Sequence, residues 1–251
     1  MNMPLISIIT VCRNSEDSIE ATMMSVVSQR YHNIEYIIID GLSTDNTFAI
    51  ANGYQEKFKE KEIKFVCVSE KDKGIYDAMN KGIFKANGDW LIFMNSGDNF
   101  YDDLVLKNVF SQTFDNNEMV IYGDTLTKNA KTTIKPPKKI QKEFFFAETI
   151  CHQSVFFKKE AFQIVGIFNL NYKIIADRIW LLKATILKVK FNYTPVIFSI
   201  WDEEGFSKEN IPTYIKENDT LKRIYFSGFE RFLFAWKFRI CRVFTFFKHK
   251  T

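Results

Sequence analysis

Four short apolar runs, separated by stretches with helical periodicity, make up much of the first hundred residues. The runs are Leu5 to Val11, Glu35 to Asp40, Ile63 to Val68 and Trp90 to Met94. Apolar runs of this length, rich in β-branched residues, are typical of strands buried on both faces of a parallel sheet. Strands that alternate with helices in this way predict a doubly wound α/β sheet.

The segments between these runs carry apolar residues at helical spacing. One helix is predicted over Ile19 to Val27, with Asn14 and Ser15 as its capping residues. Another is expected to begin at Ser43 to Asp45, and a third carries Ile75 to Ile83 and ends at Asn87-Gly88, a pair suited to a helix C-terminus.

The second half of the chain is less regular. Strands are predicted over Met119 to Asp124 and Ser154 to Lys158, a helix over Ala176 to Lys188, and an extended segment over Lys190 to Trp201. Lys128 to Lys142 is rich in Lys and Thr and contains two consecutive prolines, which predicts a mobile loop.

Polar residues gather where the four N-terminal runs end. They are Arg13-Asn14, Asp40-Gly41, Ser69-Glu70 and the segment Asn95 to Asp98. In doubly wound sheets ligands bind at the carboxyl ends of the strands. We therefore expect these four strand ends to converge on one binding site.

Two familiar phosphate-binding patterns are absent after the first run, since neither GxGxxG nor GxxxxGK[ST] occurs there. Carboxylates are present instead. Asp40, Glu70 or Asp72, and Asp98 could hydrogen-bond a base or ribose and bind a hard cation such as Mg²⁺ or Mn²⁺. Gly97 permits a tight turn. This arrangement suits a nucleotide diphosphate bound through a metal.

Composition and termini exclude several classes of protein. The four cysteines are far apart and form no CxxC pair, and the three histidines are equally scattered, which argues against a zinc site and fits reduced thiols. There is no run of about 18 apolar residues that would predict a spanning helix. The N-terminus lacks the basic region and cleavage site of a signal peptide, so we expect a cytosolic protein.

The basic character of the chain lies in its C-terminal segment. Residues 221–251 contain eight Lys or Arg and one acidic residue, Glu230, so the net charge of this segment is +7. Because the net charge of the whole chain is +4, residues 1–220 carry about −3. Aromatic residues alternate with these basic ones. Such a pattern is typical of an interfacial membrane helix, although nucleic-acid binding uses the same residue types and a helix packed on the core would also be aromatic.

Five segments carry a resemblance to a known family. They are "ISIITVCRN", "IIIDGLSTDNT", "SEKDKGIYDAMNKGIFKANGDWLIFMNSGD", "HQSVFFKKEAF" and "ADRIWLL", and together they run through roughly residues 5–185. In these segments the chain resembles the family 2 glycosyltransferases, and among them the bacterial enzymes that build O-antigen, capsule or exopolysaccharide. The resemblance implies an α/β GT-A fold, which is a Rossmann-like mixed sheet flanked by helices.

The resemblance also implies donor-binding positions along these segments. The aspartate after the second strand, Asp40, corresponds to the residue that contacts the base in this family. The other positions implied to line the donor and nucleotide pocket are Thr10, Cys12, Arg13, Asn14, Glu70, Asp72, Lys73, Gly74, Asn80, Asn95 and Ser96.

The family's metal motif, Asp-x-Asp, falls on Asn95-Ser96-Gly97-Asp98. Only its last carboxylate is present, so the resemblance implies that Asp98 is the principal ligand of Mn²⁺ or Mg²⁺. The family's catalytic base lies in an acidic pair that opens a helix, which implies Asp177 as the base; a plain helix cap would have the same residue type. His152 and Gln153 are expected to contact the acceptor or diphosphate, and the alternative is a polar pair at a strand start. The segment "EEGFS" corresponds to a loop over the donor.

The expected function is inverting transfer of a hexose from a nucleotide-sugar to a lipid-linked saccharide. UDP-galactose, UDP-glucose and UDP-N-acetylhexosamine are the candidate donors, and a polyprenyl-diphosphate-linked saccharide is the candidate acceptor. We expect residues 1–210 to form the GT-A domain and residues 211–251 a helical tail that binds the cytoplasmic face of the inner membrane, with no nucleic-acid partner. Two alternatives stay open: a non-catalytic scaffold that binds nucleotide-sugars, and a nucleic-acid-binding protein that uses the tail.

Overall fold

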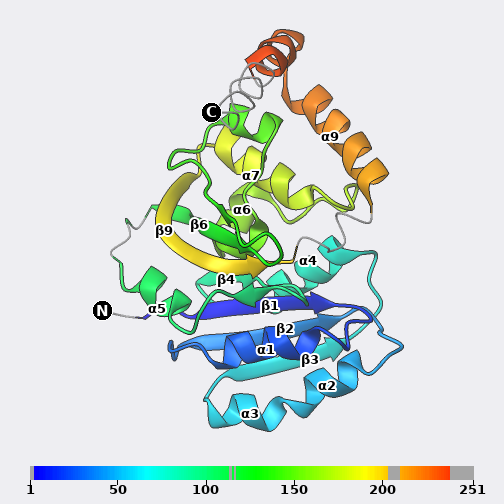
Figure 1. Cartoon of the computed structure of the whole chain (residues 1–251), viewed down its shortest axis with the longest axis vertical. Helices are drawn as coiled ribbons and strands as arrows, with labels where there is room; N and C mark the ends of the chain where they lie inside the picture. Colours follow the sequence, from blue (N-terminus) through cyan, green and yellow to red (C-terminus); the bar gives the residue numbers. More distant parts are fainter. Residues whose placement is uncertain (1–2, 113–114, 116, 203–209, 238–251) are drawn as a thin grey trace.

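The four apolar runs of the N-terminal half form four parallel strands in a computed structural model that describes residues 3–112, 115, 117–202 and 210–237. They are β1 (Ile6–Cys12), β2 (Ile34–Asp40), β3 (Lys64–Ser69) and β4 (Trp90–Phe93), and they lie side by side in the order β3-β2-β1-β4 (Figure 1). Every residue of β1, β2 and β4 is buried, as the continuous apolar runs predict.

Strands from the second half extend the same sheet and make it mixed. β8 (Val155–Lys158) pairs antiparallel with β4, and β6 (Glu118–Thr127) pairs antiparallel with β8. The long strand β9 (Lys190–Trp201) runs parallel to β6 and curves along it in Figure 1, and β5 (Asn99–Phe100) pairs antiparallel with its end. The sheet therefore has a parallel half followed by a mixed half.

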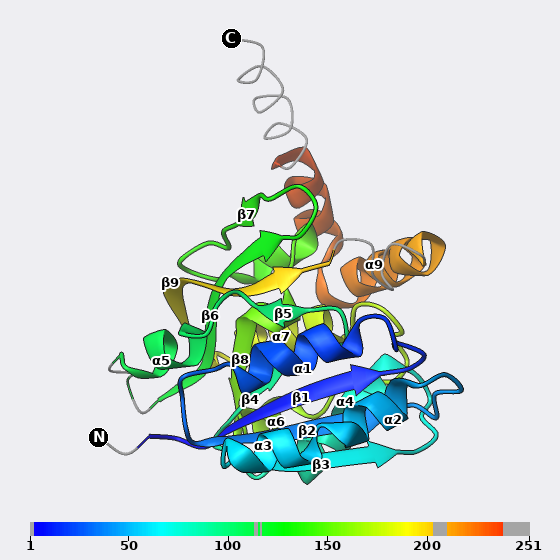
Figure 2. The same ribbon diagram turned by 60° about the horizontal axis from the view of Figure 1, so that its bottom comes forward.

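Helices cover both faces of the sheet (Figures 1 and 2). One hydrophobic cluster joins the sheet to α4, α6 and α7, and a second joins the other face to α1, α2, α3 and α5. The bounds of these helices are Ile19–Val27 for α1, Thr47–Gly53 for α2, Gln55–Glu60 for α3, Ile75–Lys85 for α4, Val105–Phe110 for α5, Ala161–Val165 for α6 and Ala176–Ile186 for α7. Two short 3₁₀ helices, Lys142–Phe146 (η1) and His152–Ser154 (η2), complete this part of the chain.

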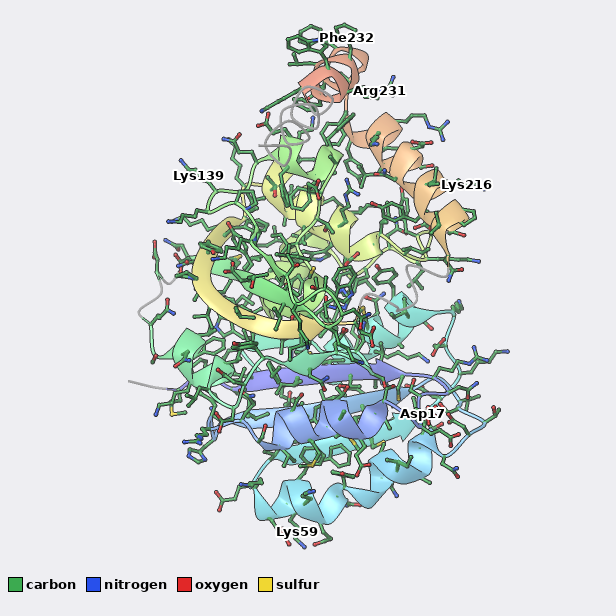
Figure 3. All side chains as sticks on the ribbon, viewed as in Figure 1. Asp17, Lys59, Lys139, Lys216, Arg231 and Phe232 are labelled. Carbon is green, nitrogen blue, oxygen red and sulfur yellow. The ribbon has the colours of Figure 1, made fainter. Side chains whose placement is uncertain are left out.

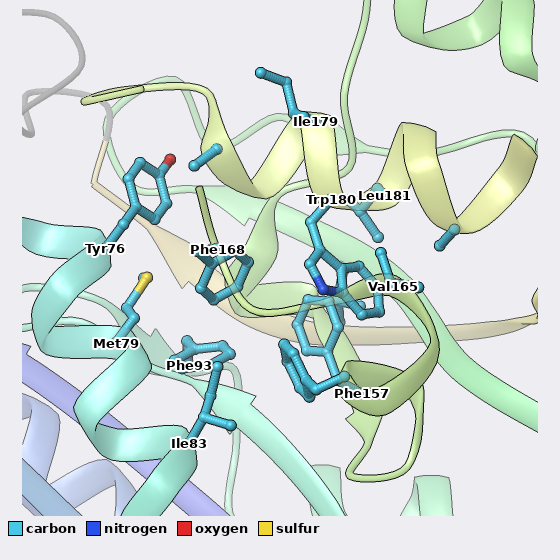
Figure 4. Close-up of a cluster of buried hydrophobic side chains, with 14 of the residues drawn as sticks. Tyr76, Met79, Ile83, Phe93, Phe157, Val165, Phe168, Ile179, Trp180 and Leu181 are labelled. Atoms are coloured by element: carbon cyan, nitrogen blue, oxygen red, sulfur yellow. The ribbon is translucent and has the colours of Figure 1, made fainter. Parts of the chain in front are cut away.

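Aromatic side chains fill the space between the sheet and α7 (Figure 4). Phe157 packs edge to face against Trp180 and Phe168, and Phe168 packs in the same way against Phe93. The indole of Trp180 donates its hydrogen bond to the carbonyl of Gly166 at 2.7 Å. The high phenylalanine content thus supplies a tightly packed layer that carries α7.

Two details of the predicted elements are wrong. The segment expected to be a mobile loop contains a short strand, β7 (Thr133–Ile134), which pairs with β6. Asn14 and Ser15 do not cap α1, which begins at Ile19, because the side chain of Asn14 accepts a hydrogen bond from Thr44 N instead.

The described part of the predicted tail folds against the domain. It consists of α9 (Ile211–Tyr225) and a further helix over residues 228–237. Leu221 is fully buried, and the ring of Phe226 packs against Phe146. Beyond this contact the chain leads to Arg231 and Phe232, which lie at the opposite end of the molecule from Lys59 (Figure 3). Within the described residues, none of the helices combines the length and the apolar character needed to span a bilayer.

A buried carboxylate stabilises the end of the sheet opposite the predicted site. Glu35 on β2 is 1% exposed and accepts hydrogen bonds from Ser7 Oγ (2.6 Å), Gly88 N (3.1 Å) and both the backbone and side chain of Asn87. Burial alone would raise the pKa of Glu35, but these hydrogen bonds outweigh it and lower the pKa below its ordinary value. The ionised form is therefore the one that stabilises the fold.

We expect Glu35→Gln to lower the free energy of unfolding at pH 7 by about 1–2 kcal/mol, because the amide cannot replace charge-assisted hydrogen bonds. A lowered folded-state pKa contributes stability that is present above the unfolded pKa and lost as pH falls through the folded one. Denaturant titrations should therefore show the difference shrinking below about pH 4. Glu60→Gln, at an exposed position, is the control; a difference that does not change with pH would contradict this role of the charge.

Candidate active site

A pocket of about 450 Å³ opens at the carboxyl ends of β1 and β4, between the start of α4 and the start of α7. Its location confirms that the ends of these two strands converge on one site. The predicted site residues on its wall are Cys12, Arg13, Asp72, Gly74, Asn95, Ser96, Asp98, His152, Gln153 and Asp177.

The turn after β4 brings the metal-motif residues to this pocket. Gly97 has φ +99°, a conformation that favours glycine, and Asp98 N donates to the carbonyl of Asn95 at 3.0 Å to close the turn. The hydroxyl of Thr22 on α1 accepts from Gly97 N (3.0 Å) and donates to the carbonyl of Asp98 (2.8 Å). Helix α1 therefore fixes the position of the turn through the two hydrogen bonds of Thr22.

Asp98 is a buried carboxylate in the pocket wall, with 7% of its surface exposed. Burial raises its pKa to about 6, although nearby His152 and a hydrogen bond from Gln153 oppose this shift. Burial thus disfavours the charged form of Asp98, and a bound cation would stabilise that charge.

Asn95 offers a second oxygen beside Asp98. Its side-chain nitrogen donates to His152 Nε2 at 2.9 Å, and its Oδ1 atom is buried without a hydrogen-bond partner among the described residues. A buried carbonyl oxygen that lacks a partner fits a hard cation. The described residues contain no cluster of three or more His, Cys, Asp or Glu side chains around a common point, so a bound Mg²⁺ or Mn²⁺ would take its other ligands from phosphates and water.

Asp177, in the first turn of α7, is held by three hydrogen bonds. Its Oδ1 accepts from the hydroxyl of Tyr76 and from Arg178 N, both at 2.8 Å, and its Oδ2 lies 3.3 Å from His152 Nδ1. Burial alone would raise its pKa, but His152, Tyr76 and Arg178 N together lower it. The pKa of His152 is raised in turn, because its hydrogen bond to Asp177 and the charge of that residue outweigh the effect of burial. Asp177 is therefore ionised and fixed in orientation.

His152 connects the turn after β4, which carries Asn95, to Asp177 at the start of α7. With Asn95 Nδ2 donating to its Nε2, the Nδ1 atom carries the proton and faces Asp177. A continuous hydrogen-bonded chain thus runs from the turn after β4 through His152 to Asp177 and Tyr76. The sequence placed Tyr76 in the core, and its ring does pack there against Phe168 (Figure 4), but its hydroxyl also reaches Asp177.

Three residues predicted to contact the donor do not line the pocket wall. Asp40 is fully buried and accepts hydrogen bonds from Ser43 and Ser69, so its carboxylate orders the loop after β2. Thr10 donates to the carbonyl of Met94 at 2.6 Å inside the sheet. Asn80 exchanges two 2.9 Å hydrogen bonds with the backbone of Phe168. These polar groups are hydrogen-bonded within the fold, and their contact with the donor stays a prediction.

Three further predicted residues lie near the rim but not on the pocket wall. The side chain of Asn14 is bonded to the loop after β2. The carboxylate of Glu70 lies 3.7 Å from Lys81 Nζ, and Lys73 is exposed, with its backbone N–H bonded to Asp77. The structure therefore leaves these three outside the pocket, whereas their neighbour Asp72 lines it and accepts from Gly74 N at 2.8 Å.

The pocket also contains residues that sequence reasoning missed. Lys173, in the segment before α7, joins Arg13 as one of two Lys or Arg side chains on the described wall. Trp201 and Asp202, at the end of β9, line it as well. In the sequence, Lys173 stands four residues before Asp177, and this closeness to a predicted site residue is the feature that could have indicated its place in the pocket. The segment "EEGFS", expected to cover the donor, is residues 203–207 and lies outside the described residues.

Comparison with known proteins agrees with this geometry. The family model Glycosyl transferase family 2 matches residues 7–176, more than half of the chain. A Mycobacterium bovis protein named PGL/p-HBAD biosynthesis glycosyltransferase is 30% identical over 178 residues, which cover 70% of this chain and 68% of the relative. An uncharacterized glycosyltransferase of Haemophilus influenzae is 38% identical over 109 residues, or 43% of this chain and 42% of that one.

Solved structures share the fold at low sequence identity. S. aureus TarS 1–349, in complex with UDP-GlcNAc, has a TM-score of 0.67 at 17% identity, covering 82% of this chain and 61% of TarS 1–349. The mannosyltransferase PcManGT of Pyrobaculum calidifontis, in complex with GDP-Man and Mn²⁺, has a TM-score of 0.67 at 16% identity, covering 84% and 61%. The chain thus spans about three fifths of the length of these structures. It is a glycosyltransferase of family 2 with the GT-A fold.

Proposed function

We propose that this enzyme transfers a hexose, with inversion, from a nucleotide-sugar to a lipid-linked saccharide in the synthesis of a bacterial surface polysaccharide such as O-antigen or capsule. The observation that carries the proposal is the composition of one pocket. It combines the oxygens of Asn95 and Asp98, the cations of Arg13 and Lys173, and the ionised carboxylate of Asp177.

The donor is a nucleoside diphosphate sugar, and we favour a UDP-hexose such as UDP-galactose, UDP-glucose or a UDP-N-acetylhexosamine. Arg13 and Lys173 supply positive charge toward its diphosphate. Asp98 and the unpartnered oxygen of Asn95 would hold Mn²⁺ or Mg²⁺, whose charge stabilises the departing diphosphate. The complexes of TarS with UDP-GlcNAc and of PcManGT with GDP-Man and Mn²⁺ support this class of donor.

Asp177 acts as the general base. It takes the proton of an acceptor hydroxyl as the oxygen forms a bond to the anomeric carbon, and the bond from that carbon to the diphosphate oxygen breaks, so that UDP leaves from the opposite face. The hydrogen bonds from Tyr76 and Arg178 N orient the carboxylate for this role. His152, bonded to Asp177, stabilises its charge and lies where the acceptor or diphosphate would pass.

The acceptor proposal depends on the C-terminal helices. Phe229, Phe232 and Trp236 are between 60% and 74% exposed on the helix over residues 228–237, with Arg231 and Lys237 on the same helix. Aromatic anchors beside basic side chains suit the surface of an anionic bilayer. We place this enzyme on the cytoplasmic face of the inner membrane, where it extends a polyprenyl-diphosphate-linked saccharide.

A screen of nucleotide-sugar turnover tests the donor and metal proposals. We expect UDP release from at least one UDP-sugar in the presence of a polyprenyl-diphosphate-linked saccharide and Mn²⁺, and loss of that release in EDTA. Because Asp at position 95 adds a charged oxygen, Asn95→Asp should preserve or strengthen metal-dependent release. A protein that neither releases nor binds UDP, or a folded Asn95→Asp variant without activity, would refute the corresponding proposal.

Asp177→Asn separates an enzyme from a non-catalytic scaffold, the alternative suggested by the single carboxylate of the metal motif. Removing the base should lower kcat about 10²–10⁴-fold, while calorimetry shows UDP affinity within about threefold of wild type. Asp219→Asn, an exposed change on α9 with the same loss of charge, is the control. Unchanged turnover in a folded Asp177→Asn variant would favour the scaffold.

Vesicle sedimentation tests membrane association against nucleic-acid binding. The triple variant Phe229→Ser, Phe232→Ser, Trp236→Ser should bind vesicles of anionic phospholipid about tenfold or more weakly, since it loses three apolar anchors. Phe84→Ser, which removes a 72% exposed ring from α4, should bind like wild type. Retention by nucleic acid with a steep salt dependence, and no retention by vesicles, would instead support the nucleic-acid-binding reading.

A further inference from the structure

A carboxylate from α9 holds the segment that leads into α7. Glu217 accepts hydrogen bonds from three consecutive backbone N–H groups: Lys173 (2.6 Å), Ile174 (3.0 Å) and Ile175 (3.3 Å). Ile175, the residue before the first residue of α7, makes no side-chain capping bond. Glu217, 8% exposed and more than 40 positions away in sequence, therefore binds the backbone that leads into α7, and not the N–H groups of the first turn that a local cap would bind.

Helix α9 makes a second contact on the other side of Asp177. The guanidinium of Arg178 is 1% exposed, donates to the carbonyl of Phe145 (2.7 Å from Nη2) and donates to the hydroxyl of Tyr214 on α9 (3.3 Å from Nη1). Residues 173–175, which precede Asp177, and Arg178, which follows it, are therefore both bonded to α9. Leu221 anchors α9 by burying its side chain completely in the core below.

The same segment faces the pocket on its other side. Lys173, Ile174 and Asp177 all line the pocket wall. The hydroxyl of Tyr76 on α4 bonds both to the carbonyl of Ile174 (2.6 Å) and to Asp177 Oδ1 (2.8 Å). The segment before α7 is thus held between α4 and α9. The backbone N–H groups of residues 173–175 bind Glu217, while Lys173, Ile174 and Asp177 line the pocket.

We propose that Glu217 is a positioning residue for the transfer reaction, which makes α9 a part of the active site and not only a tail. Glu217 is not among the residues that line the pocket, and it acts through the backbone of residues 173–175. The inference rests on the proposed role of Asp177 as the base. Displacement of a catalytic group by about 1 Å can cost about a hundredfold in rate, so loosening this segment affects the chemical step more than donor binding.

Glu217→Gln tests the proposal, because the amide keeps the size of the side chain but removes its charge. With the UDP-sugar that the wild type uses best, kcat should fall about tenfold to a hundredfold. The KM for that UDP-sugar should rise by a clearly smaller factor than kcat falls, because Arg13, Asn95 and Asp98 are unchanged and only Lys173 among the proposed donor contacts lies in the loosened segment. Tyr214→Phe, which removes only the bond to Arg178, should lower kcat less. Asp219→Asn, two positions along on the exposed side of α9, is the control and should leave both constants unchanged.

Amide hydrogen exchange gives a readout that needs no substrate. The amides of Lys173, Ile174 and Ile175 should exchange at least tenfold faster in Glu217→Gln, while those of β1 and β4 keep their protection, which also shows that the variant is folded. Unchanged exchange at these amides, or faster exchange with unchanged kcat, would overturn the positioning role. A kcat and KM that change together would also overturn it, in favour of general destabilisation. Wild type that releases no UDP would overturn the proposed function, and the inference would fall with it.

Discussion

The parallel pairing of β1 with both β2 and β4 is the constraint on which the site depends. Because Ile9 pairs with Phe93 and Cys12 with Asp40, the three strands end at nearly the same level. Their carboxyl ends therefore deliver Arg13 and the turn Asn95 to Asp98 to one edge of the sheet, where the pocket opens. Every other contribution to the site is brought to this edge by elements that pack on the parallel core.

The switch to antiparallel pairing at β8 contributes the second half of the site. β8 runs opposite to β4, with Ile92 paired to Phe156, so the residues that precede β8 lie beside those that follow β4. This is why His152 reaches Asn95, although the two are 57 positions apart in sequence. His152 then bridges to Asp177, which α7 brings in from the face covered by the aromatic layer around Trp180. The hydrogen-bonded chain across the pocket is thus a product of strand direction and helix packing together.

Sequence reasoning was accurate for elements and partly accurate for the site. The four apolar runs, α4, α7 and β9 were predicted within a few residues, and the turn at Gly97 was predicted from residue type alone. Asp40, Thr10 and Asn80 were expected to face the donor, but each is satisfied by an internal hydrogen bond. Polar residues at strand ends are equally suited to binding a ligand and to ordering a loop. The difference depends on neighbours such as Ser43, Ser69 and Phe168, whose positions no local pattern shows.

The sequence by itself determined the order of strands and helices, because apolar periodicity and turn chemistry are local properties. The resemblance of the segments that contain Asp98 and Asp177 to a known family implied the GT-A class. Only the tertiary structure decided that Tyr76 and His152 orient Asp177 and that Lys173 shares the pocket. It also decided that α9, which the composition assigned to a membrane-bound tail, binds the segment before Asp177 through Glu217. These features arise from hydrogen bonds between residues far apart in the chain, formed only once the sheet has aligned its strand ends and the helices have packed on it.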